Sequence, residues 1–284
     1  MTQTVLITGC SSGFGRLIAQ TFMREGWNVI ATMRSPERET EFNDSDRMQV
    51  LKLDVTDRDS IAKAFNDGRY KFGRIDVVVN NAGYGGFGLF EQASDADVRS
   101  MFETNVFGPM NVMRAALPAM REAGTGAIIN VTSMAGHIGL PGNAVYSASK
   151  HAMIGLTEGM ALEYEPLGIR IYSVAPGAYP TTRFDQSTDK RLDYGDEQLA
   201  TWSNRVRNQI TAVGEQMANE GGSLADPQEV ADRVYACATS DMPIHNPTGS
   251  DAEMLTTMMG QDRRQDFLDQ LATMLIPSAE ATRA

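Results

Sequence analysis

The sequence predicts an α/β fold in which helices cover both faces of a doubly wound, parallel sheet of about seven strands. Short, almost continuously apolar runs recur along the first two-thirds of the 284-residue chain, as expected for parallel strands buried on both faces. Helical stretches separate these runs, and such alternation is typical of a doubly wound sheet. Because no repeat, low-complexity tract or linker interrupts the chain, we expect one domain over residues 1–284.

The expected elements alternate in the order that this fold requires. Six of the strands can be placed from their β-branched runs, at Thr4–Thr8, Asn28–Thr32, Met48–Leu53, Val77–Asn80, Ala127–Thr132 and Arg170–Val174. Helices are expected at Arg16–Glu25, Asp57–Tyr70, Asp95–Arg121, Val145–Pro166, Pro227–Thr239 and around Arg263–Leu275. The long polar stretch 179–225 breaks the pattern, and we expect it to contain one or two helices and to form a lid. The tail 277–284 is expected to fray.

Composition and charge narrow the class of protein. Hydrophobic residues make up 42% and charged residues 21%, which is ordinary for a globular chain that fills a core. The 25 basic and 36 acidic residues leave a net charge of −11, which disfavours binding to nucleic acid or to an anionic membrane. Two cysteines favour a reducing compartment, and we find neither a transmembrane run nor a basic leader. We therefore expect a cytoplasmic protein, without a metal because its histidines and cysteines lack metal-ligand spacing.

A glycine-rich turn joins the first expected strand to the first expected helix. Glycines let the backbone approach a pyrophosphate closely, and the helix that follows presents free N–H groups and the positive end of its dipole. The spacing is G-x-x-x-G-x-G, and no Gly-Lys-Ser/Thr ends it as in a P-loop. The turn predicts dinucleotide binding, with a purely structural tight turn as the alternative. Its candidate contacts are Gly9, Ser11, Ser12, Gly13, Phe14 and Gly15.

The end of the second strand bears on the choice of cofactor. About twenty residues past the glycine loop, an NAD-binding chain carries an acidic residue that contacts the ribose. Met33 occupies that position here, and Arg34 follows it. An arginine there can pair with a 2′-phosphate, so we predict NADP(H) as the preferred cofactor, with NAD(H) possible. The alternatives are a solvated arginine, or Glu37 or Glu39 as ribose ligands if the strand ends elsewhere.

Other strand ends carry further candidates for cofactor contacts. An aspartate after the third strand can accept a hydrogen bond from an adenine amino group, or it can cap the next turn. Small residues after the fourth strand indicate either backbone beside a ligand or a tight turn. The segment after the sixth strand lies at the same edge of the sheet and can line a nicotinamide. These candidates are Asp54, Val55, Asn81, Ala82, Gly83, Pro176, Gly177 and Tyr179.

Tyr146 and Lys150 form the candidate catalytic pair. They are four residues apart in an expected helix, so they lie on one helix face. A nearby ammonium favours the phenolate, and we expect Lys150 to lower the pKa of Tyr146 toward neutrality. Ser133 ends the fifth strand, where its hydroxyl can hold a substrate oxygen. An exposed helical pair without a catalytic role is the alternative.

Asn105 is a candidate because of the proline that follows it in the Asp95–Arg121 helix. Pro109 has no N–H and clashes with the carbonyl four residues earlier, which belongs to Asn105. The Asn105 carbonyl is therefore expected to leave the helix ladder and to become free for water or a side chain. A kink that only relieves packing is the alternative.

Together, these motifs closely resemble the short-chain dehydrogenase/reductase family. The match covers roughly Thr4–Thr181 and, more loosely, Asp226–Ala252. The motifs are T-G-x-x-x-G-x-G at Thr8–Gly15, D-V at Asp54–Val55, N-N-A-G at Asn80–Gly83, N-V-F-G at Asn105–Gly108, the Ser133, Tyr146 and Lys150 set, and P-G at Pro176–Gly177. As a set they are highly specific.

The resemblance implies a Rossmann-type oxidoreductase that interconverts a carbonyl and an alcohol by hydride transfer at a nicotinamide. Tyr146 would then exchange a proton with the substrate oxygen, and Ser133 would bind that oxygen. Lys150 would hold the nicotinamide ribose and tune Tyr146. Asn105 would hold, through its main chain, a water that links Lys150 to solvent. Thr181 would contact the carboxamide or the phosphates of the cofactor.

The resemblance extends to a branch and leaves alternatives open. Leu6–Gly15, Val29–Arg34 and Asn105–Gly108 look like the hydroxysteroid and retinol dehydrogenase branch. The C-terminal stretch Thr248–Ala252 departs from the family's commonest pattern, which favours a homodimer over the tetramer that also occurs. We expect a small carbonyl or alcohol substrate that is partly apolar. The alternatives are a silent dinucleotide-binding regulator and an NAD-linked sugar-nucleotide epimerase or dehydratase, whose glycine spacing differs.

Overall fold

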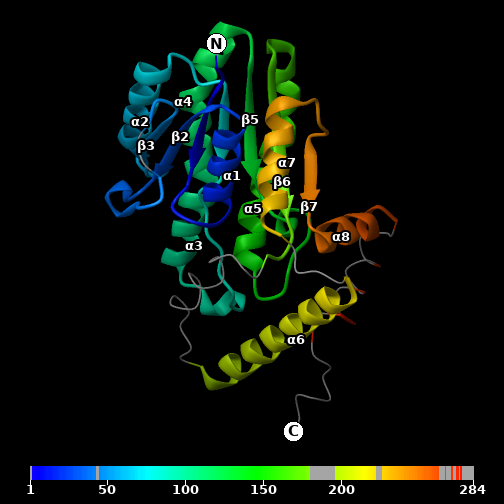
Figure 1. Ribbon diagram of the computed structural model, residues 1–284. Helices are drawn as coiled ribbons and strands as arrows, with labels where there is room; N and C mark the ends of the chain where they lie inside the picture. The colour runs from blue at the N-terminus through cyan, green and yellow to red at the C-terminus, as the bar shows by residue number, and fades with distance from the viewer. Residues whose placement is uncertain are drawn as a thin grey trace.

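The computed structural model describes residues 2–42, 45–179, 196–221 and 226–261, and five single positions beyond them. Within this part, seven parallel strands form one sheet in the order β3-β2-β1-β4-β5-β6-β7. The predicted doubly wound α/β class is therefore confirmed (Figure 1). The strands are β1 Thr4–Thr8, β2 Asn28–Met33, β3 Met48–Lys52, β4 Val77–Asn80, β5 Gly126–Val131, β6 Ile169–Pro176 and β7 His245–Thr248.

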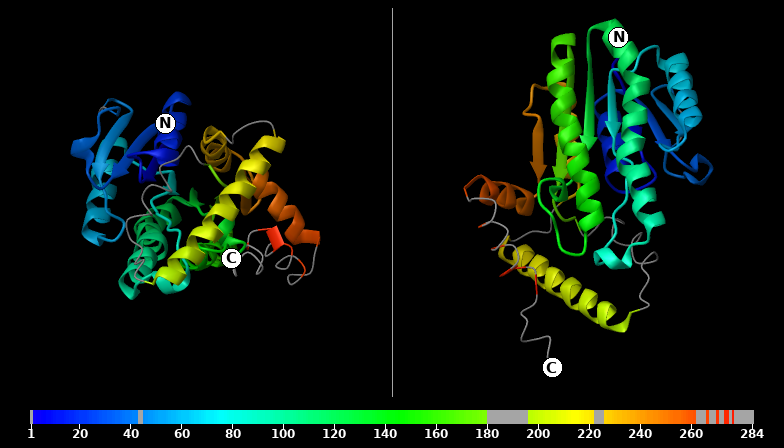
Figure 2. Two further views of the ribbon diagram at one scale, coloured as in Figure 1. Left: turned by 90° about the horizontal axis from the view of Figure 1, so that it is seen from below. Right: turned by 180° about the vertical axis from the view of Figure 1, so that it is seen from behind.

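Helices cover both faces of this sheet. On one face, α1 (Gly13–Arg24) packs beside α7 (Gln228–Thr239). Figure 2 shows the opposite face, which is covered by α2 (Arg58–Phe72), α4 (Gly108–Ala123) and α5 (Ala144–Tyr164). Three more helices lie toward the end of the sheet where the strands finish, namely α3 (Asp95–Phe102), α6 (Glu197–Gly221) and α8 (Ser250–Gln261).

The central strand β1 shows why the sheet needs helices on both sides. Successive side chains of a strand point to opposite faces. Val5 and Ile7 therefore pack into the core under α1 and α7, whereas Leu6 packs into the core under α2, α4 and α5. All three side chains are completely buried, and this double burial produces the continuous apolar run that identified the strand.

One predicted helix, Asp95–Arg121, is wrong as a single regular element. The structure divides it into α3, a π-helical turn over Glu103–Phe107, and α4. Pro109 accounts for the division, because it cannot donate to the carbonyl four residues earlier and fits the first turn of a new helix, where no such bond is needed. The turn widens the helix where Asn105 sits, and such π-turns are frequent at functional sites.

The C-terminal third contains two elements that the sequence did not locate. β7 reads His-Asn-Pro-Thr and lacks an apolar pattern, but as the edge strand next to β6 it tolerates a proline. α8 follows it directly. The expected helix around Arg263–Leu275 lies largely outside the described residues, as does the tail 277–284.

The stretch 179–225 contains a helix, as predicted. α6 lies across the end of the sheet where the strands finish (Figures 1 and 2). Ile138, in the loop after β5, is fully buried against Ile210 and Val213 of this helix. Arg207 of α6 also stacks over the Phe87 ring, 4.7 Å from its centroid. Residues 180–195 and 222–225 of the expected lid lie outside the described part, and closure of a lid stays a prediction.

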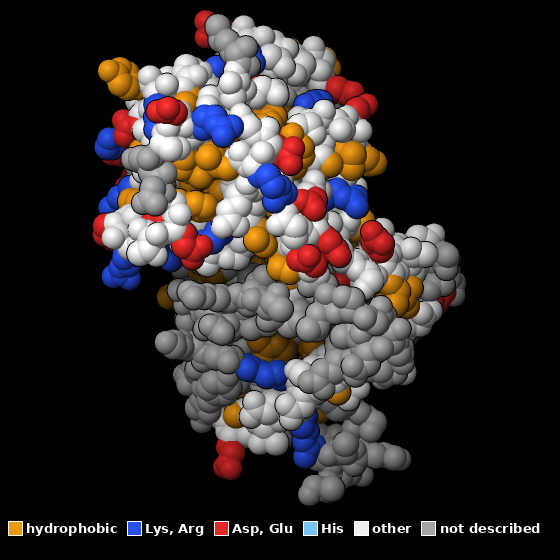
Figure 3. All heavy atoms as spheres, in the orientation of Figure 1, with side chains coloured by type: hydrophobic (Ala, Val, Ile, Leu, Met, Phe, Trp, Pro, Cys, Tyr) orange, Lys and Arg blue, Asp and Glu red, His pale blue; other side chains and the backbone are white. Residues whose placement is uncertain are grey.

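The surface of the molecule carries its charges in mixed order. Figure 3 shows acidic and basic side chains interspersed over the face that carries α1 and α7. None of the described helices has both the length and the apolar character needed to cross a membrane. On the face that carries α1 and α7, therefore, the charges of the described residues are mixed in sign and no single-sign patch dominates among them.

We predict that Phe22→Ala lowers the free energy of unfolding by about 3–5 kcal/mol. The Phe22 ring is fully buried and makes edge-to-face contacts with Trp27 and Tyr235, at centroid distances of 5.1 and 5.2 Å, which join α1 to α7. The measurement is urea unfolding followed by circular dichroism. Tyr70→Ala is the control, because Tyr70 is 95% exposed, and it should change stability by less than about 0.5 kcal/mol. Equal effects of the two substitutions would contradict the packing argument.

Candidate active site

Thr8, at the end of β1, ties the glycine loop to the end of β4. Its hydroxyl accepts hydrogen bonds from the backbone N–H groups of Asn81 and Ala82, both at 3.0 Å. The Asn81 side chain in turn donates to the carbonyls of Thr8 and Gly9, at 2.9 and 3.2 Å. The structure therefore brings the predicted Asn81–Gly83 segment against the glycine loop. Sequence analysis used Thr8 only as part of a motif and missed this anchoring role.

The glycine loop has the shape of an anion cradle. Gly9 and Gly13 have φ values of 75° and 54°, a region that favours glycine. A Cβ on Gly15 would lie 2.3 Å from the Gly9 carbonyl oxygen, whereas a Cβ on Gly13 would meet no described atom within 4 Å. The Ser12 side chain makes no capping hydrogen bond among the described residues, so the first turn of α1 keeps free N–H donors. Open space beside free donors fits a pyrophosphate.

Arg34 follows β2 at the edge of this cradle and is exposed. Met33 before it is buried and brings no carboxylate. Of the two acidic alternatives, Glu37 is exposed, but Glu39 is already bound: its Oε2 accepts from Arg16 at 2.7 Å. Burial acts to raise the pKa of Glu39, yet hydrogen bonds from backbone N–H groups and the charge of Arg16 hold that pKa below its usual range. The carboxylate of Glu39 is thus already hydrogen-bonded within the chain, which disfavours it as a ribose ligand.

Asp54 and Val55 lie where β3 passes into α2. Asp54 Oδ1 accepts from the backbone N–H and the hydroxyl of Thr56, at 3.0 and 2.8 Å. The alternative that Asp54 caps the next turn is thus met, because the Asp57 N–H also donates to the Asp54 carbonyl, at 3.1 Å, while Asp57 itself is the N-cap of α2. Val55 is buried against Gly108, where a Cβ would lie only 2.7 Å from Val55 Cγ2. Asp54 therefore folds the turn after β3, and Val55 faces the core.

Tyr146 and Lys150 share one face of the first turns of α5, as their spacing predicts. Each residue is only 7% exposed. The Lys150 ammonium donates to the carbonyl of Val131 at 3.1 Å and lies 5.6 Å from the centroid of the Tyr146 ring. A Cβ on Gly83 would lie 3.7 Å from Lys150 Nζ. The same Cβ would lie 3.2 Å from Asn105 Oδ1, so Gly83 brings the loop after β4 close to both Asn105 and Lys150.

Ser133 begins a short helical turn, Met134–Gly136, which packs on α5. Its Oγ accepts from the Ala135 N–H at 3.1 Å and is also hydrogen-bonded to Tyr146. Gly136 permits the close approach, because a Cβ there would lie 2.9 Å from the Lys150 carbonyl oxygen. The structure therefore brings Ser133, Tyr146 and Lys150 together.

Burial dominates the protonation of this trio. It raises the pKa of Tyr146 well above its usual range, although the hydrogen bond from Ser133 lowers it in part. Burial also lowers the pKa of Lys150 to about 8. The expectation that Lys150 brings the pKa of Tyr146 toward neutrality is not met in this structure. The neutral phenol is the favoured form at neutral pH.

Asn105 lies in the π-helical turn and is 2% exposed. Its side-chain amide bonds both backbone groups of Tyr84: Oδ1 accepts from the N–H at 3.1 Å and Nδ2 donates to the carbonyl at 2.8 Å. Nδ2 also lies 3.2 Å from the hydroxyl of Ser149 on α5. Asn105 therefore joins α5 to the loop after β4. Sequence analysis considered only its main chain and missed this bridging by the side chain.

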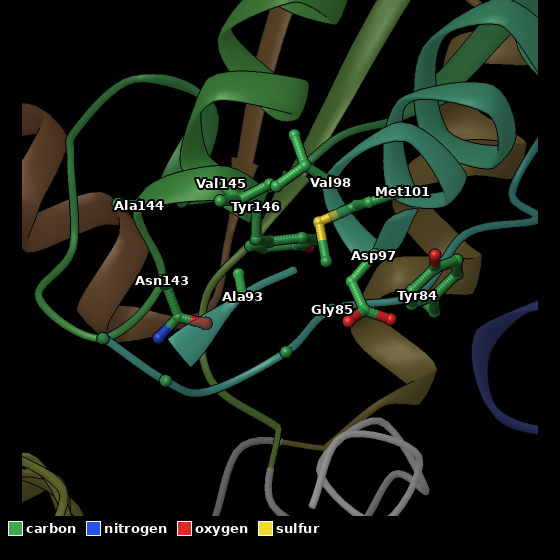
Figure 4. Close-up of a pocket in the computed structure, with 13 residues that line it drawn as sticks. Tyr84, Gly85, Ala93, Asp97, Val98, Met101, Asn143, Ala144, Val145 and Tyr146 are labelled. Carbon is green, nitrogen blue, oxygen red and sulfur yellow. The ribbon is translucent and has the colours of Figure 1, made fainter. Parts of the chain in front are cut away.

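A pocket opens beside the Tyr146 ring, between α3, the start of α5 and the loop after β4. Figure 4 shows Val98 and Met101 on one side of it and Val145 and Tyr146 on another. Met101 and Tyr146 also belong to one buried cluster. The wall is mainly apolar, and Asp97 adds a carboxylate to it. This pocket can hold an apolar group next to the phenol.

The segment after β6 closes the other side of the site. Gly177 approaches Asp251 so closely that a Cβ would lie 2.0 Å from its carboxylate. Tyr179 is buried and packs edge-to-face on Phe14 of the glycine loop, with a centroid distance of 5.3 Å. Two predicted cofactor-binding regions are thus in contact. Thr181 lies outside the described residues.

Histidine is placed away from the catalytic trio. His137 and His245 pack edge-to-face at 5.2 Å, and His245 bonds Glu158 at 2.8 Å. Burial and the neighbouring histidines lower the pKa of His137. In the described part of the chain, no three histidine, cysteine or acidic side chains gather in a way that could hold a metal ion.

Comparisons with known proteins agree with this arrangement. Residues 3–192 match the family model described as short chain dehydrogenase. A 3-ketodihydrosphingosine reductase from Bacteroides thetaiotaomicron is 39% identical over 202 residues, which are 69% of this chain and 73% of the relative.

Two solved structures share the fold over nearly their whole length. A short-chain dehydrogenase from Streptomyces avermitilis has a TM-score of 0.77 at 33% identity, with coverage of 96% of this chain and 95% of that one. A short chain dehydrogenase from Burkholderia cenocepacia, in complex with NADP, has a TM-score of 0.74 at 25% identity, with coverage of 95% and 97%.

The buried ammonium of Lys150 predicts a specific dependence of stability on pH. Between about pH 8 and the ordinary lysine value of 10.5, the unfolded chain keeps a proton that the folded chain has released, so the free energy of unfolding rises with pH. The free energy of unfolding of the wild type, minus that of Lys150→Met, should therefore increase by up to about 2 kcal/mol from pH 8 to pH 10. Denaturant unfolding at several pH values measures it. Lys63→Met, at an exposed position, should show no such rise, and a flat difference for Lys150→Met would contradict the burial argument.

Proposed function

The chain belongs to the short-chain dehydrogenase family, and on that premise we propose that it is an NADP(H)-dependent oxidoreductase that interconverts a carbonyl and a primary or secondary alcohol. The observation that supports this most directly is the buried trio of Ser133, Tyr146 and Lys150, with a pocket beside the phenol. The proposal assigns proton transfer to these side chains and hydride transfer to the nicotinamide, which supplies or takes the hydride when bound.

Tyr146 is proposed as the acid and base. Addition of a hydride to a carbonyl carbon leaves a negative oxygen, which needs a proton at once. A neutral phenol that already bonds Ser133 is suited to give that proton, while the Ser133 hydroxyl donates a second hydrogen bond to the same oxygen. Burial keeps the Tyr146 phenol protonated, which is the form that reduction of a carbonyl requires. Oxidation of an alcohol requires the phenolate, and the hydrogen bond from Ser133 favours that form.

Lys150 is proposed to bind the cofactor next to Tyr146, and Asn105 is proposed to fix the position of the loop beside Lys150. The Lys150 ammonium lies beside Gly83 at the end of β4, and we propose that it holds the nicotinamide ribose hydroxyls. Asn105 fixes the loop after β4 against α5, so that Gly83 and Lys150 keep their separation. The amide of Asn105 therefore acts on the geometry of the site, and its main chain in the π-helical turn is placed to hold a water.

The cofactor is proposed to lie across the ends of β1, β2 and β4. The glycine loop 9–15 would hold the pyrophosphate with its free N–H groups, and Arg34 would pair with the 2′-phosphate. Asn81–Gly83 and the segment from Pro176 to Tyr179 would border the nicotinamide. The NADP-containing structure from Burkholderia cenocepacia supports a phosphorylated cofactor for this family member.

The substrate is proposed to be a small carbonyl compound or alcohol with an apolar portion. The walls formed by Val98, Met101 and Val145 would accept that portion next to the phenol. The name of the Bacteroides relative specifies a ketone, which is the same class of reacting group. A panel of ketones, aldehydes and alcohols, assayed by the absorbance of the reduced nicotinamide, tests the reaction class.

We predict that Tyr146→Phe lowers kcat by about 10²- to 10⁴-fold, because phenylalanine keeps the ring but cannot transfer a proton. The dissociation constant of NADPH should change little. Steady-state kinetics on a substrate from the panel and fluorescence titration of NADPH measure the two effects. Tyr235→Phe on α7 is the matched control and should keep wild-type kcat. A Tyr146→Phe variant with more than about a tenth of the wild-type kcat would refute the assignment.

We predict that NADPH binds more tightly than NADH and that Arg34→Ala removes most of the difference. A charge-assisted contact contributes about 1.5–3 kcal/mol, or roughly 10- to 150-fold in affinity. Because Met33 has no carboxylate that could accept from the ribose 2′-hydroxyl, NADH has no compensating contact at this position. The ratio of kcat/KM for the two cofactors measures the preference. Equal values in the wild type, or a preference that survives in Arg34→Ala, would show that Arg34 does not read the 2′-phosphate.

A further inference from the structure

Arg16 is a second arginine next to the glycine loop, and its guanidinium already bonds other groups of the protein. It lies in the first turn of α1, directly after Gly15. Its guanidinium donates to the Ser11 carbonyl at 2.8 Å and to Glu39 Oε2 at 2.7 Å, and it also pairs with Glu41. It stacks on the Phe42 ring at 5.4 Å from the centroid. Its Nε is buried and finds no hydrogen-bond partner among the described residues.

Glu39 is built into the fold more deeply than a surface ion-pair partner. Its side chain is only 2% exposed, against 18% for that of Arg16 and 60% for that of Glu41. Glu39 Oε1 accepts from the backbone N–H groups of Thr40, Glu41 and Phe42, at 3.1, 2.7 and 3.1 Å. The two carboxylate oxygens thus have different partners: Oε1 holds the backbone of the segment after β2, and Oε2 accepts from Arg16.

The pair bridges the two walls between which the adenosine ribose would lie. One wall is the glycine loop, where Arg16 bonds Ser11. The other is the segment that follows β2, which contains Arg34 and Glu39. Arg16 itself joins the two walls, because it bonds Ser11 on one and Glu39 on the other. The Cys10 N–H of the glycine loop also donates to the Thr32 carbonyl in β2, at 2.9 Å. A 2′-phosphate bound between these walls would therefore meet the charges of Arg16 and Glu39.

We propose that the ion pair between Arg16 and Glu39 limits the preference for a 2′-phosphorylated cofactor, because Glu39 competes with the phosphate for Arg16. The inference rests on the proposed function, since it concerns the same cofactor. The Arg16 guanidinium could donate hydrogen bonds to the phosphate, but it already donates to Glu39. The negative charge of Glu39 also repels the phosphate. Glu39 is in this sense a specificity-determining residue without a contact to the reacting atoms.

The neighbouring charges decide how large the effect is. Arg34 and Arg38 are exposed basic residues on the segment after β2, and Glu37 and Glu41 are exposed acidic ones. These four are accessible to water and salt, which weaken their interactions. Glu39 and Glu41 both contact Arg16, but the Glu39 side chain is shielded from water whereas that of Glu41 is exposed, so the charge of Glu39 has the stronger influence on the guanidinium.

Glu39→Gln separates the two tasks of this side chain. The glutamine carbonyl can keep accepting from the three backbone N–H groups, while its amide nitrogen replaces the oxygen that faces Arg16. The segment should stay folded, and Arg16 should become available to a phosphate. The experiment measures dissociation constants by calorimetry for adenosine 2′,5′-bisphosphate and for 5′-AMP, which differ only in the 2′-phosphate. These fragments lack the nicotinamide, so binding is read without turnover.

In Glu39→Gln, the ratio of affinities for the bisphosphate and for 5′-AMP should rise by about fivefold over wild type, the order expected for one partly exposed charged contact. In Arg16→Gln the ratio should fall, because Glu39 then faces the phosphate unpaired. In the double variant, Glu39→Gln should no longer give its full increase. Glu25→Gln, which removes an exposed carboxylate at the far end of α1, is the control for net charge and should leave the ratio unchanged.

The outcomes distinguish this inference from the proposed function. Glu39→Gln with a wild-type ratio would overturn the inference and leave the cofactor proposal standing. An equal increase from Glu39→Gln in the Arg16→Gln background would also overturn it, since Arg16 would then have no part in the effect. If neither fragment binds to the wild-type chain, the proposed cofactor fails and the inference fails with it. Should Glu39→Gln not fold, the fall expected in Arg16→Gln still decides the question.

Discussion

The parallel direction of all seven strands is the constraint on which the rest of this molecule depends. Parallel strands must be joined by crossovers, so every strand finishes at the same edge of the sheet. Residues that are separated by more than a hundred positions in sequence, such as Gly9 and Tyr146, are thereby delivered to one region. The loop after each strand can then vary without disturbing the double-faced core that holds the strands in register.

The chemistry of the site follows from how the sheet edge is packed. The turn after β5 lies directly on α5, because Gly136 has no side chain to keep it away from Lys150. The same contact buries Tyr146 and Lys150, and burial disfavours the charged form of both residues. A buried ammonium is costly to place in a core, even when it bonds a carbonyl as Lys150 does. Strongly shifted groups next to a pocket are typical of functional sites, which agrees with the proposed role of the pair.

Two devices hold the cofactor side of the edge in place, and both use side chains that bond backbone groups. Asn81 and Thr8 fasten the glycine loop to β4, while Glu39 folds the segment after β2 and anchors Arg16. Such bonds fix irregular backbone that a sheet or a helix cannot stabilise. They also fix Arg16 and Glu39 relative to the glycine loop, so the local folding of two loops bears on the proposed choice of cofactor.

The sequence by itself determined the α/β class, six of the strands and the positions of the glycine loop and the tyrosine–lysine pair. These features are local: apolar runs record burial on both faces, and a spacing of four residues sets a helix face. Only the tertiary structure decided the rest. It broke the long helix at Pro109, placed the polar strand β7 at the sheet edge, turned the Asn105 side chain toward Tyr84 and Ser149, and committed Glu39 to Arg16. Each of these outcomes depends on partners that are distant in sequence, and burial, which raises the pKa of Tyr146 against the local expectation, arises only when those partners pack together.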